Sequence, residues 1–320
     1  MRILVTGGMG FIGHNVVAQL EELGHDVTIV DNFTDYGIIP EDELIALMQE
    51  RQSQISSVNY IYDIAWPEIV DVFKSNEPEL VIHLASYPRQ KVVNNNPALA
   101  ADTMMKGLLN LCELSTKYKV KKFVYVSSSM VYGDFKDGVN EYFACKPQGQ
   151  YAIMKLAGEQ IVRDYGYRGC FDYTIVRPSA VYGPRDVEDR VVSKFFMAAM
   201  RDEVLKINGK DEKLDFTYVT DTASGIVGAS LSRVTPFRTY NITRGESRTL
   251  LEAAELITKI VGKGKIEIAY KSEDYPSRGS LCSDAANMDF GFDPKINIEE
   301  GFVKYYDYLV NSPFWSQKAV

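Results

Sequence analysis

A glycine-rich turn near the N-terminus constrains the fold of this chain more than any other feature. Residues 6–13 read Thr-Gly-Gly-Met-Gly-Phe-Ile-Gly, in which Gly7, Gly10 and Gly13 have the spacing G-x-x-G-x-x-G. An apolar run, Ile3–Val5, precedes the turn, and a helical pattern follows it. Glycines at these positions let phosphate oxygens approach the N–H groups at the start of a helix, where the helix dipole favours an anion. The pattern therefore predicts a dinucleotide site at the end of the first strand.

Apolar runs and helical patterns alternate along the N-terminal half of the chain. The apolar runs are short and rich in β-branched residues, as in strands buried on both faces. They are Ile3–Val5, Val27–Val30, Leu80–Leu84, Phe123–Val126 and Tyr173–Val176. The helical patterns between them are Gly13–Leu23, Trp66–Ser75, Thr103–Tyr118 and Tyr151–Tyr165. This alternation predicts an α/β fold, a Rossmann-type doubly wound parallel sheet with helices on both faces.

The C-terminal part of the chain is less regular. Its clearest elements are two helices and a short strand, at Val191–Met200, Leu250–Val261 and Ile266–Ala269. We expect a dinucleotide-binding Rossmann domain at residues 1–178 and a smaller, mainly substrate-binding α+β domain at 179–320. Segments such as 215–245 are expected to return to the first domain. A polar helix at Asp42–Gln54 is expected near the adenosine end of the cofactor.

Composition narrows the functional classes. The chain has 320 residues, a net charge of -8 and a pI near 5.1, and it contains no basic block. We therefore expect no nucleic-acid partner. The apolar run at the N-terminus is too short for a membrane span or a signal peptide, so no membrane partner is expected. The four cysteines and three histidines are scattered without metal-ligand spacing, which predicts no metal site and a reducing, cytoplasmic location.

Asp31 follows the second predicted strand and indicates which dinucleotide binds. A carboxylate at this position accepts hydrogen bonds from the adenosine ribose hydroxyls and repels a 2′-phosphate. Asn32 and Phe33 come next, so no adjacent cation reverses that preference. The pattern favours NAD over NADP. The alternative interpretation is that Asp31 only ends a strand and caps a turn.

A Tyr-x-x-x-Lys pattern at Tyr151 and Lys155 supplies the chemistry. Residues four apart share one face of a helix. A free tyrosine has a pKa of about 10 and is a poor base at neutral pH, but a lysine ammonium and an oxidised nicotinamide ring both favour its phenolate. The phenolate can take a hydroxyl proton while the nicotinamide takes the carbon-bound hydride. By itself the pattern is also consistent with a surface pair on a helix.

A serine-rich segment after the strand Phe123–Val126 completes the catalytic set. It reads Ser127-Ser128-Ser129, and hydroxyls at the carboxyl end of a strand face the active-site crevice of this type of sheet. A serine there can bridge the substrate hydroxyl and Tyr151. The alternative is a turn whose serines bond their own backbone.

The order of these motifs resembles the extended short-chain dehydrogenase/reductase family, in its nucleotide-sugar epimerase/dehydratase branch. The resemblance covers nearly the whole chain. It rests on Thr6–Gly13, Asp31, Asp63, His83-Leu84-Ala85, Ser127–Gly133, Tyr151 with Lys155, and Arg177–Pro184. The resemblance implies NAD, a nucleoside-diphosphate sugar and usually a homodimer. Dimers of this family pair two helices of each subunit, which correspond here to Thr103–Tyr118 and Tyr151–Tyr165.

The residue patterns and the resemblance together give two sets of candidate residues. Those expected to contact NAD are Gly7, Gly10, Phe11, Ile12, Gly13, Asp31, Asn32, Asp63, Ile64, Leu84, Ala85, Ser86, Ser127, Tyr151, Lys155 and Pro178. Those expected to contact the sugar nucleotide are Ser86, Arg89, Ser128, Ser129, Tyr151, Arg185, Lys194 and Arg278. For the basic residues of the second set, a solvated surface position is the alternative.

The resemblance also narrows the reaction. It places the catalytic hydroxyl four positions before Tyr132, at Ser128. Sugar 4,6-dehydratases carry an acidic pair directly after that position, whereas this chain has Ser129 and Met130. Decarboxylating relatives have a glutamate where Met130 stands. The remaining set of serine, tyrosine and lysine suffices to oxidise and re-reduce one carbinol, as in C4 epimerisation through a 4-keto intermediate.

Three departures from the family pattern point away from UDP-galactose as the substrate. Ala180, Met104 and Leu214 replace residues that often touch that sugar nucleotide, so we expect a different one. Two other functions stay open. One is a net dehydrogenase, reductase or dehydratase that acts on the same class of substrate. The other is a non-catalytic, NAD-sensing scaffold, because a fold does not fix a function.

Overall fold

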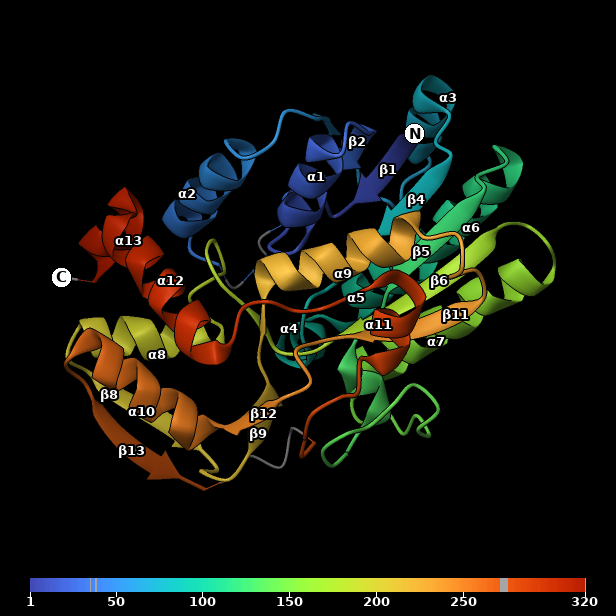
Figure 1. Cartoon of the computed structure of the whole chain (residues 1–320). Helices are drawn as coiled ribbons and strands as arrows, with labels where there is room; N and C mark the ends of the chain where they lie inside the picture. The colour runs from blue at the N-terminus through green and yellow to red at the C-terminus, as the bar shows by residue number, and fades with distance from the viewer. Residues whose placement is uncertain (35, 38, 271–275, 320) are drawn as a thin grey trace.

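A seven-stranded parallel sheet forms the centre of the molecule (Figure 1). The computed structural model describes residues 1–34, 36–37, 39–270 and 276–319. The strands lie in the order β11-β6-β5-β4-β1-β2-β3, and each neighbouring pair is parallel. Their bounds are β1 Arg2–Thr6, β2 Asp26–Val30, β3 Val58–Tyr60, β4 Leu80–His83, β5 Lys122–Val126, β6 Asp172–Pro178 and β11 Arg238–Ile242. The predicted doubly wound α/β fold is confirmed.

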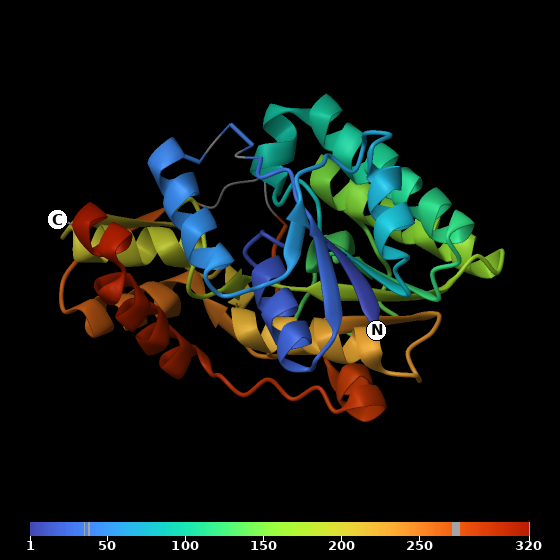
Figure 2. The same ribbon diagram turned by 90° about the horizontal axis from the view of Figure 1, so that it is seen from above.

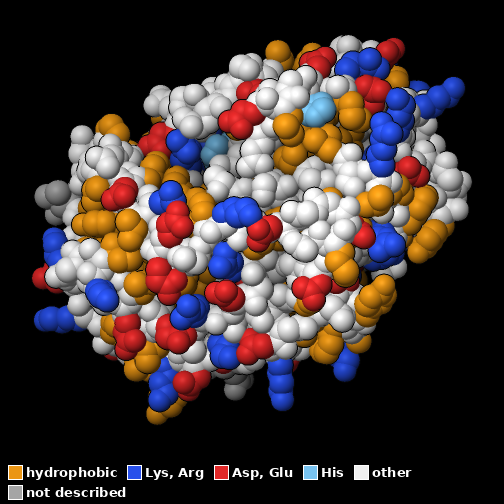
Figure 3. Space-filling model, in the orientation of Figure 1, with side chains coloured by type: hydrophobic (Ala, Val, Ile, Leu, Met, Phe, Trp, Pro, Cys, Tyr) orange, Lys and Arg blue, Asp and Glu red, His pale blue; other side chains and the backbone are white. Residues whose placement is uncertain are grey.

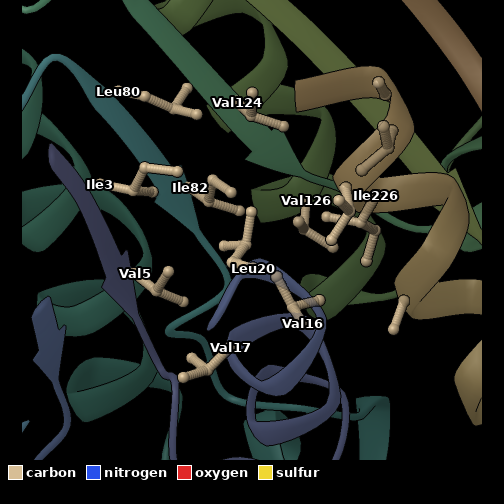
Figure 4. Close-up of a cluster of buried hydrophobic side chains, with 14 of the residues drawn as sticks. Ile3, Val5, Val16, Val17, Leu20, Leu80, Ile82, Val124, Val126 and Ile226 are labelled. Carbon is tan, nitrogen blue, oxygen red and sulfur yellow. The ribbon is translucent and has the colours of Figure 1, made fainter. Parts of the chain in front are cut away.

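The sheet is covered by helices on both faces, because successive side chains of each strand point to opposite sides. Ile3 and Val5 of β1 pack with α1 (Gly13–Glu22) and α9 (Val219–Leu231), as Figure 4 shows. Leu4, between them, faces the other side. The helices on that side are α3 (Ile69–Asn76), α6 (Leu108–Lys117) and α7 (Gln150–Tyr167).

The five strands and four helices predicted for the N-terminal half are all present, with shifts at their ends. The helix predicted from Trp66 begins only at Ile69, because Pro67 disfavours a helical conformation in the residue before it. The helix predicted from Thr103 begins with a π-helical turn, Asp102–Gly107, before α6. Two short helices before it, α4 (Gln90–Asn95) and α5 (Pro97–Ala101), were not predicted.

The sheet reverses its strand order between β1 and β4, and this position determines where a ligand can enter. In doubly wound sheets the crevice opens at the carboxyl ends of the strands on either side of such a reversal. Gly7 follows β1 at this point with φ +73°, and a Cβ atom added to it would lie 2.6 Å from the backbone nitrogen of Ala85, just after β4. Only glycine lets the two chain segments approach this closely.

The C-terminal part forms a second hydrophobic cluster beside the carboxyl edge of the sheet (Figures 1 and 2). Its helices are α8 (Val191–Met200), α10 (Leu250–Val261), α12 (Ile298–Asn311) and α13 (Pro313–Lys318). Its strands pair two by two: β7 (Val181–Tyr182) with β10 (Thr217–Tyr218), β9 (Lys213–Asp215) with β12 (Ser247–Thr249), and β8 (Val204–Asn208) with β13 (Lys265–Ala269). A further helix, α11 (Asp284–Phe290), packs near β11 and α9. The helices at 191–200 and 250–261 have the predicted bounds.

Helix α2 (Glu41–Gln52) joins the two parts of the molecule. Leu47 belongs to the C-terminal hydrophobic cluster, and the Glu43 carboxylate accepts a hydrogen bond of 2.8 Å from the backbone N–H of Glu188. At the other end of the helix, Glu50 accepts a bond of 2.9 Å from the Ser312 hydroxyl. Both views show α2 beside α12 and α13 (Figures 1 and 2). The excursion predicted at the adenosine end therefore also packs against the C-terminal helices.

Charges of both signs are interspersed over the face of the molecule shown in Figure 3. Within the described residues, none of the helices combines the length and the apolar character needed to cross a bilayer. The same part of the chain holds no group of three His, Cys, Asp or Glu side chains placed to bind a metal ion.

A buried histidine makes the stability of this fold sensitive to acid. The ring of His83 is 2% exposed, and its Nδ1 lies 2.7 Å from the Thr6 hydroxyl. Burial, helped by the charge of Lys155, lowers the pKa of His83 to about 3 from 6.5. Between these two values the unfolded chain binds a proton that the folded protein does not. We expect this group to lower the free energy of unfolding, as the pH falls from 6.5 towards 3, by at most about 1.4 kcal/mol per pH unit.

Urea unfolding at several pH values between 7 and 4 measures this slope. The His83→Gln variant should show a shallower loss of stability than the unmodified protein. His25→Gln, at a partly exposed position where the pKa is lowered less than that of His83, is the matched control and should keep more of the slope than His83→Gln. Equal slopes for the unmodified protein and His83→Gln would contradict the assignment.

Candidate active site

One cavity of about 530 Å³ lies at the carboxyl ends of the central strands, between the sheet and the loops that lead into α8. Every residue that the sequence predicted at the cofactor lines it. Ser86, Arg89, Ser128, Ser129, Tyr151, Lys194 and Arg278 of the predicted substrate set line it as well. The cavity therefore brings the glycine-rich turn and the Tyr-x-x-x-Lys pair, which are far apart in the sequence, into one space.

The glycine-rich turn is closed tightly onto the start of α1. The N–H of Gly10 donates to the carbonyl of Gly7 at 3.1 Å, and a Cβ atom on Gly13 would lie 2.0 Å from that same carbonyl oxygen. No side chain caps the N-terminus of α1, although the N–H of His14, its second residue, donates to the carbonyl of Gly10 at 3.1 Å. An uncapped helix start reached through glycines suits a pyrophosphate.

Asp31 is held in place by the glycine-rich turn. Its carboxylate accepts hydrogen bonds from the N–H of Met9 at 3.0 Å and from the N–H of Phe33 at 2.9 Å. Burial raises the pKa of Asp31, while these two bonds and the charge of Arg51 oppose the rise. The sequence around Asp31 showed no cation, but α2 brings Arg51 from the far side of the cavity. The N–H groups of Arg51 donate to backbone carbonyls of Met9 (3.2 Å) and Arg185 (2.7 Å).

The catalytic candidates meet where β5 ends and α7 begins. The Ser128 hydroxyl accepts a bond of 3.2 Å from the N–H of Met130, which caps a short 3₁₀ turn at Ser129–Tyr132, and the hydroxyl lines the cavity with the Tyr151 phenol. One helical turn beyond the tyrosine, Lys155 Nζ donates to the carbonyl of Val126 at 2.8 Å and lies 6.0 Å from the centre of the Tyr151 ring. Strand β5 and helix α7 therefore present all three groups to the same cavity.

Burial shifts the pKa values of both Tyr151 and Lys155. It raises the pKa of Tyr151, and the nearby Ser128 hydroxyl and the charge of Arg190 act against that rise. It lowers the pKa of Lys155 to about 7, while the nearby Glu159 carboxylate raises it. At neutral pH the phenol is thus protonated and the lysine is near the midpoint of its titration. The electrostatic influence of Arg190 on the phenol was not predicted from the sequence.

A buried ion pair lies directly behind these groups. Glu159, one turn beyond Lys155 on α7, accepts bonds from Arg177 Nε at 2.9 Å and from Arg177 Nη2 at 2.6 Å. The Ser127 hydroxyl donates to the same carboxylate at 2.6 Å. The hydroxyl of Ser127 is therefore engaged by Glu159, although the residue lines the cavity.

Arg185 differs from the other predicted substrate residues, because it does not line the cavity. Its guanidinium carbon lies 5.8 Å from the centre of the Tyr308 ring, and its backbone, at φ +67°, turns the carbonyl towards Arg51. Five residues later, Arg190 does line the cavity. The lining of the cavity therefore lends no support to the substrate role expected for Arg185, which stays a prediction.

Comparison with known proteins identifies the family. The model of the NAD dependent epimerase/dehydratase family matches residues 3–243. The chain belongs to this family. Its resemblance to the nucleotide-sugar branch of the extended short-chain dehydrogenases is confirmed, and NAD is the cofactor. The geometry agrees with this, because the uncapped helix start and Asp31 are the groups that the dinucleotide requires.

Individual relatives are similar over nearly their whole length. A probable UDP-glucuronate 4-epimerase of Rhizobium meliloti is 28% identical, over 96% of this chain and 97% of the relative. The crystal structure of a UDP-glucose 4-epimerase of Thermus thermophilus with NAD superposes with a TM-score of 0.85 at 26% identity, and covers 96% of this chain and 98% of its own. A UDP-glucuronic acid 4-epimerase of Bacillus cereus, in complex with UDP-glucuronic acid and NAD, gives a TM-score of 0.88 at 25% identity, with the same coverage.

The hydrogen bonds of Asp31 lead to a prediction about cofactor affinity. Asp31→Ala should weaken NAD binding about 10- to 100-fold, because a charged acceptor for the ribose hydroxyls is lost. Titration calorimetry of protein freed of its cofactor measures the change. Asp26→Ala, at the exposed start of the same strand, is the matched control and should bind NAD normally. Unchanged affinity in Asp31→Ala would refute the assignment.

Proposed function

We propose that this protein epimerises a nucleoside-diphosphate sugar at C4, with NAD as a permanently bound cofactor. The observation that carries the proposal is that Ser128, Tyr151 and Lys155 line the same cavity as the glycine-rich turn and Asp31. Two of the relatives described above are named as 4-epimerases of UDP-sugars in complexes with NAD, which supports the same reaction.

The proposed roles follow from the geometry of each side chain. Ser128 orients the C4 hydroxyl of the sugar towards Tyr151, and the Tyr151 oxygen takes and later returns the hydroxyl proton. Lys155, fixed by the Val126 carbonyl, lies close enough to the phenol ring to stabilise its ionised form. NAD supplies the hydride acceptor and, after reduction, the hydride donor. Loss and return of hydride at one carbon inverts that carbon when the keto sugar presents its other face.

The neighbouring side chains argue against loss of water. Met130, where dehydratases carry an acidic residue, has no proton to transfer and is 8% exposed. The Ser129 hydroxyl donates to the Ser179 hydroxyl at 3.1 Å. Neither group forms an acid–base pair, so the proposed reaction is epimerisation and not dehydration.

The same proposal includes a homodimer and two domains. Leu109 of α6 and Ile153 of α7 are large apolar side chains that are 41% and 52% exposed, on the two helices expected to pair between subunits.

Residues 1–178 are proposed to bind NAD, and 179–320 to bind most of the sugar nucleotide, with segments such as 215–245 belonging to the first domain. A cytoplasmic location remains the prediction from the scattered cysteines.

Replacement of the tyrosine tests the proposed proton transfer. Tyr151→Phe should lower kcat about 10²- to 10⁴-fold, because the proton acceptor is lost while the ring that fills the site remains. Incubation with UDP-, GDP-, CDP- and dTDP-sugars, followed by NMR, reports new epimers and any loss of water. Tyr142→Phe, at a side chain that is 94% exposed, is the control and should be fully active. A Tyr151→Phe variant with normal turnover would remove the mechanism.

The amount of NADH formed, and the need for added NAD, distinguish an epimerase from a dehydrogenase that uses the same site. An epimerase regenerates NAD in every cycle, so the purified protein should contain NAD(H) and should turn over many substrate equivalents with none added. The absorbance of reduced nicotinamide should not accumulate with product. Stoichiometric NADH formation, or a strict need for added NAD, would show a net oxidoreductase.

A further inference from the structure

Helix α2 carries its buried side chains on one face. Glu43, Leu47 and Arg51 are the buried residues of this helix, and they lie four positions apart, so they follow one another along one side of it. Arg51 is only 7% exposed, whereas arginine is seldom buried this deeply unless its N–H groups find partners. The proposed proton transfer and the predicted cofactor contacts do not use this residue. Its burial therefore needs another explanation.

The guanidinium of Arg51 joins two backbone segments that are far apart in the sequence. Its Nη1 donates to the carbonyl of Met9, in the glycine-rich turn, at 3.2 Å. Its Nη2 and Nε both donate to the carbonyl of Arg185, at 2.7 Å and 3.3 Å. All three nitrogens of one planar group are thus used to hold two carbonyls, which a single point donor could not do in the same way.

Both of these segments form part of the cavity wall. Met9 lines the cavity together with the glycines that are expected to contact NAD, and Arg51 lines it beside them. The other segment, residues 183–190, connects β7 to α8, and we call it the 183–190 loop. The members of this loop that line the cavity are Asp186, Val187, Asp189 and Arg190. Arg51 therefore ties the wall at the cofactor end to a wall at the substrate end.

Helix α2 holds the 183–190 loop at two points. The Glu43 carboxylate accepts a bond of 2.8 Å from the N–H of Glu188, and about two helical turns later Arg51 binds the carbonyl of Arg185. The Lys318 ammonium strengthens the first point, since it lies 2.9 Å from the Glu43 carboxylate and 3.0 Å from that of Glu188. The position of the loop is thus set by α2 and by the C-terminal helix α13.

The backbone at both ends of the Arg51 contact depends on hydrogen bonds. Arg185 has φ +67°, a left-handed conformation that is unfavourable for a residue other than glycine and persists where its surroundings hold it. At the other end, the N–H of Met9 donates to the Asp31 carboxylate at 3.0 Å, while its carbonyl accepts from Arg51. Loss of the guanidinium would therefore free the 183–190 loop and would also loosen the turn that holds Asp31.

We propose that Arg51 is a positioning residue for both ligands of the cavity, because it keeps the glycine-rich turn and the 183–190 loop in their binding positions. This inference rests on the proposed function, which supplies a sugar nucleotide as the second ligand. A residue that only stabilised the fold would lower the midpoint of urea unfolding and leave the affinities of the folded protein unchanged. A residue that only contacted NAD would alter NAD affinity alone.

Two binding constants test the inference in the full-length protein. Titration calorimetry gives the Kd of NAD for protein freed of its cofactor, and the Kd of UDP, GDP, CDP and dTDP at an NAD concentration that saturates each protein. Arg51→Gln should raise the Kd of NAD and that of the best nucleoside diphosphate by about 5- to 50-fold each, as expected for the loss of a charge-assisted bond. Gln52→Ala, at the next and exposed position of α2, is the matched control and should change neither value.

A weaker binding of NAD alone, or of neither ligand, in folded Arg51→Gln would overturn the inference and leave the proposed function intact. An unmodified protein that binds NAD but none of the four nucleoside diphosphates would overturn the proposed function, and the inference with it.

Arg51→Lys keeps the charge and is the test that remains if Arg51→Gln does not fold. Its ammonium presents its donors from one point, so it should not replace the bonds to both Met9 and Arg185. At least one of the two Kd values should stay about fivefold or more above that of the unmodified protein. Full recovery of both values would show that the positive charge alone is needed, and would overturn the inference.

Discussion

The buried ion pair between Glu159 and Arg177 is the interaction on which the active site depends. Glu159 is fully buried on α7 and Arg177 is 3% exposed on β6, and two short hydrogen bonds join them. Because the Ser127 hydroxyl donates to the same carboxylate, the pair also fixes the end of β5. Removal of one partner of such a pair costs about 3–5 kcal/mol, since the other charge stays buried. One carboxylate thus sets the position of the helix and of the strand that carry the catalytic groups.

This carboxylate has an electrostatic effect as well as a structural one. Lys155 lies one helical turn before Glu159, and burial lowers its pKa to about 7. The negative charge of Glu159 acts against that fall and keeps part of the lysine protonated at neutral pH. Without it, a smaller fraction of this lysine would be protonated at neutral pH. The Glu159 carboxylate therefore has two effects: its ion pair with Arg177 holds α7 on the sheet, and its charge favours the protonated form of Lys155.

The sequence predicted the local elements well because they leave local signals. Strand β1, the glycine-rich turn and the start of α1 follow one another without interruption, and the requirement for glycine at Gly13 arises within the turn itself. Tyr151 and Lys155 needed only helical spacing to share a face. Strands β3 and β11 were not among the predicted strands, because β3 has only three residues, and β11 includes Arg238, Thr239 and Asn241. These two strands are held in the sheet by their pairing with β2 and β6, and the pattern of apolar residues along a sequence does not reveal such pairing.

The substrate end of the cavity could not be predicted in the same way, because long-range packing positions its residues. Arg185 and Arg190 are close in the sequence and have the same chemistry. The left-handed backbone at Arg185 sends its carbonyl to Arg51 of α2, while Arg190, at the start of α8, lines the cavity. Arg51 reaches both this loop and the glycine-rich turn, since its other N–H group donates to Met9. The α2 segment therefore connects the glycine-rich turn, at the cofactor end of the cavity, to the loop that leads into α8, and this connection could not be read from the residues around either motif.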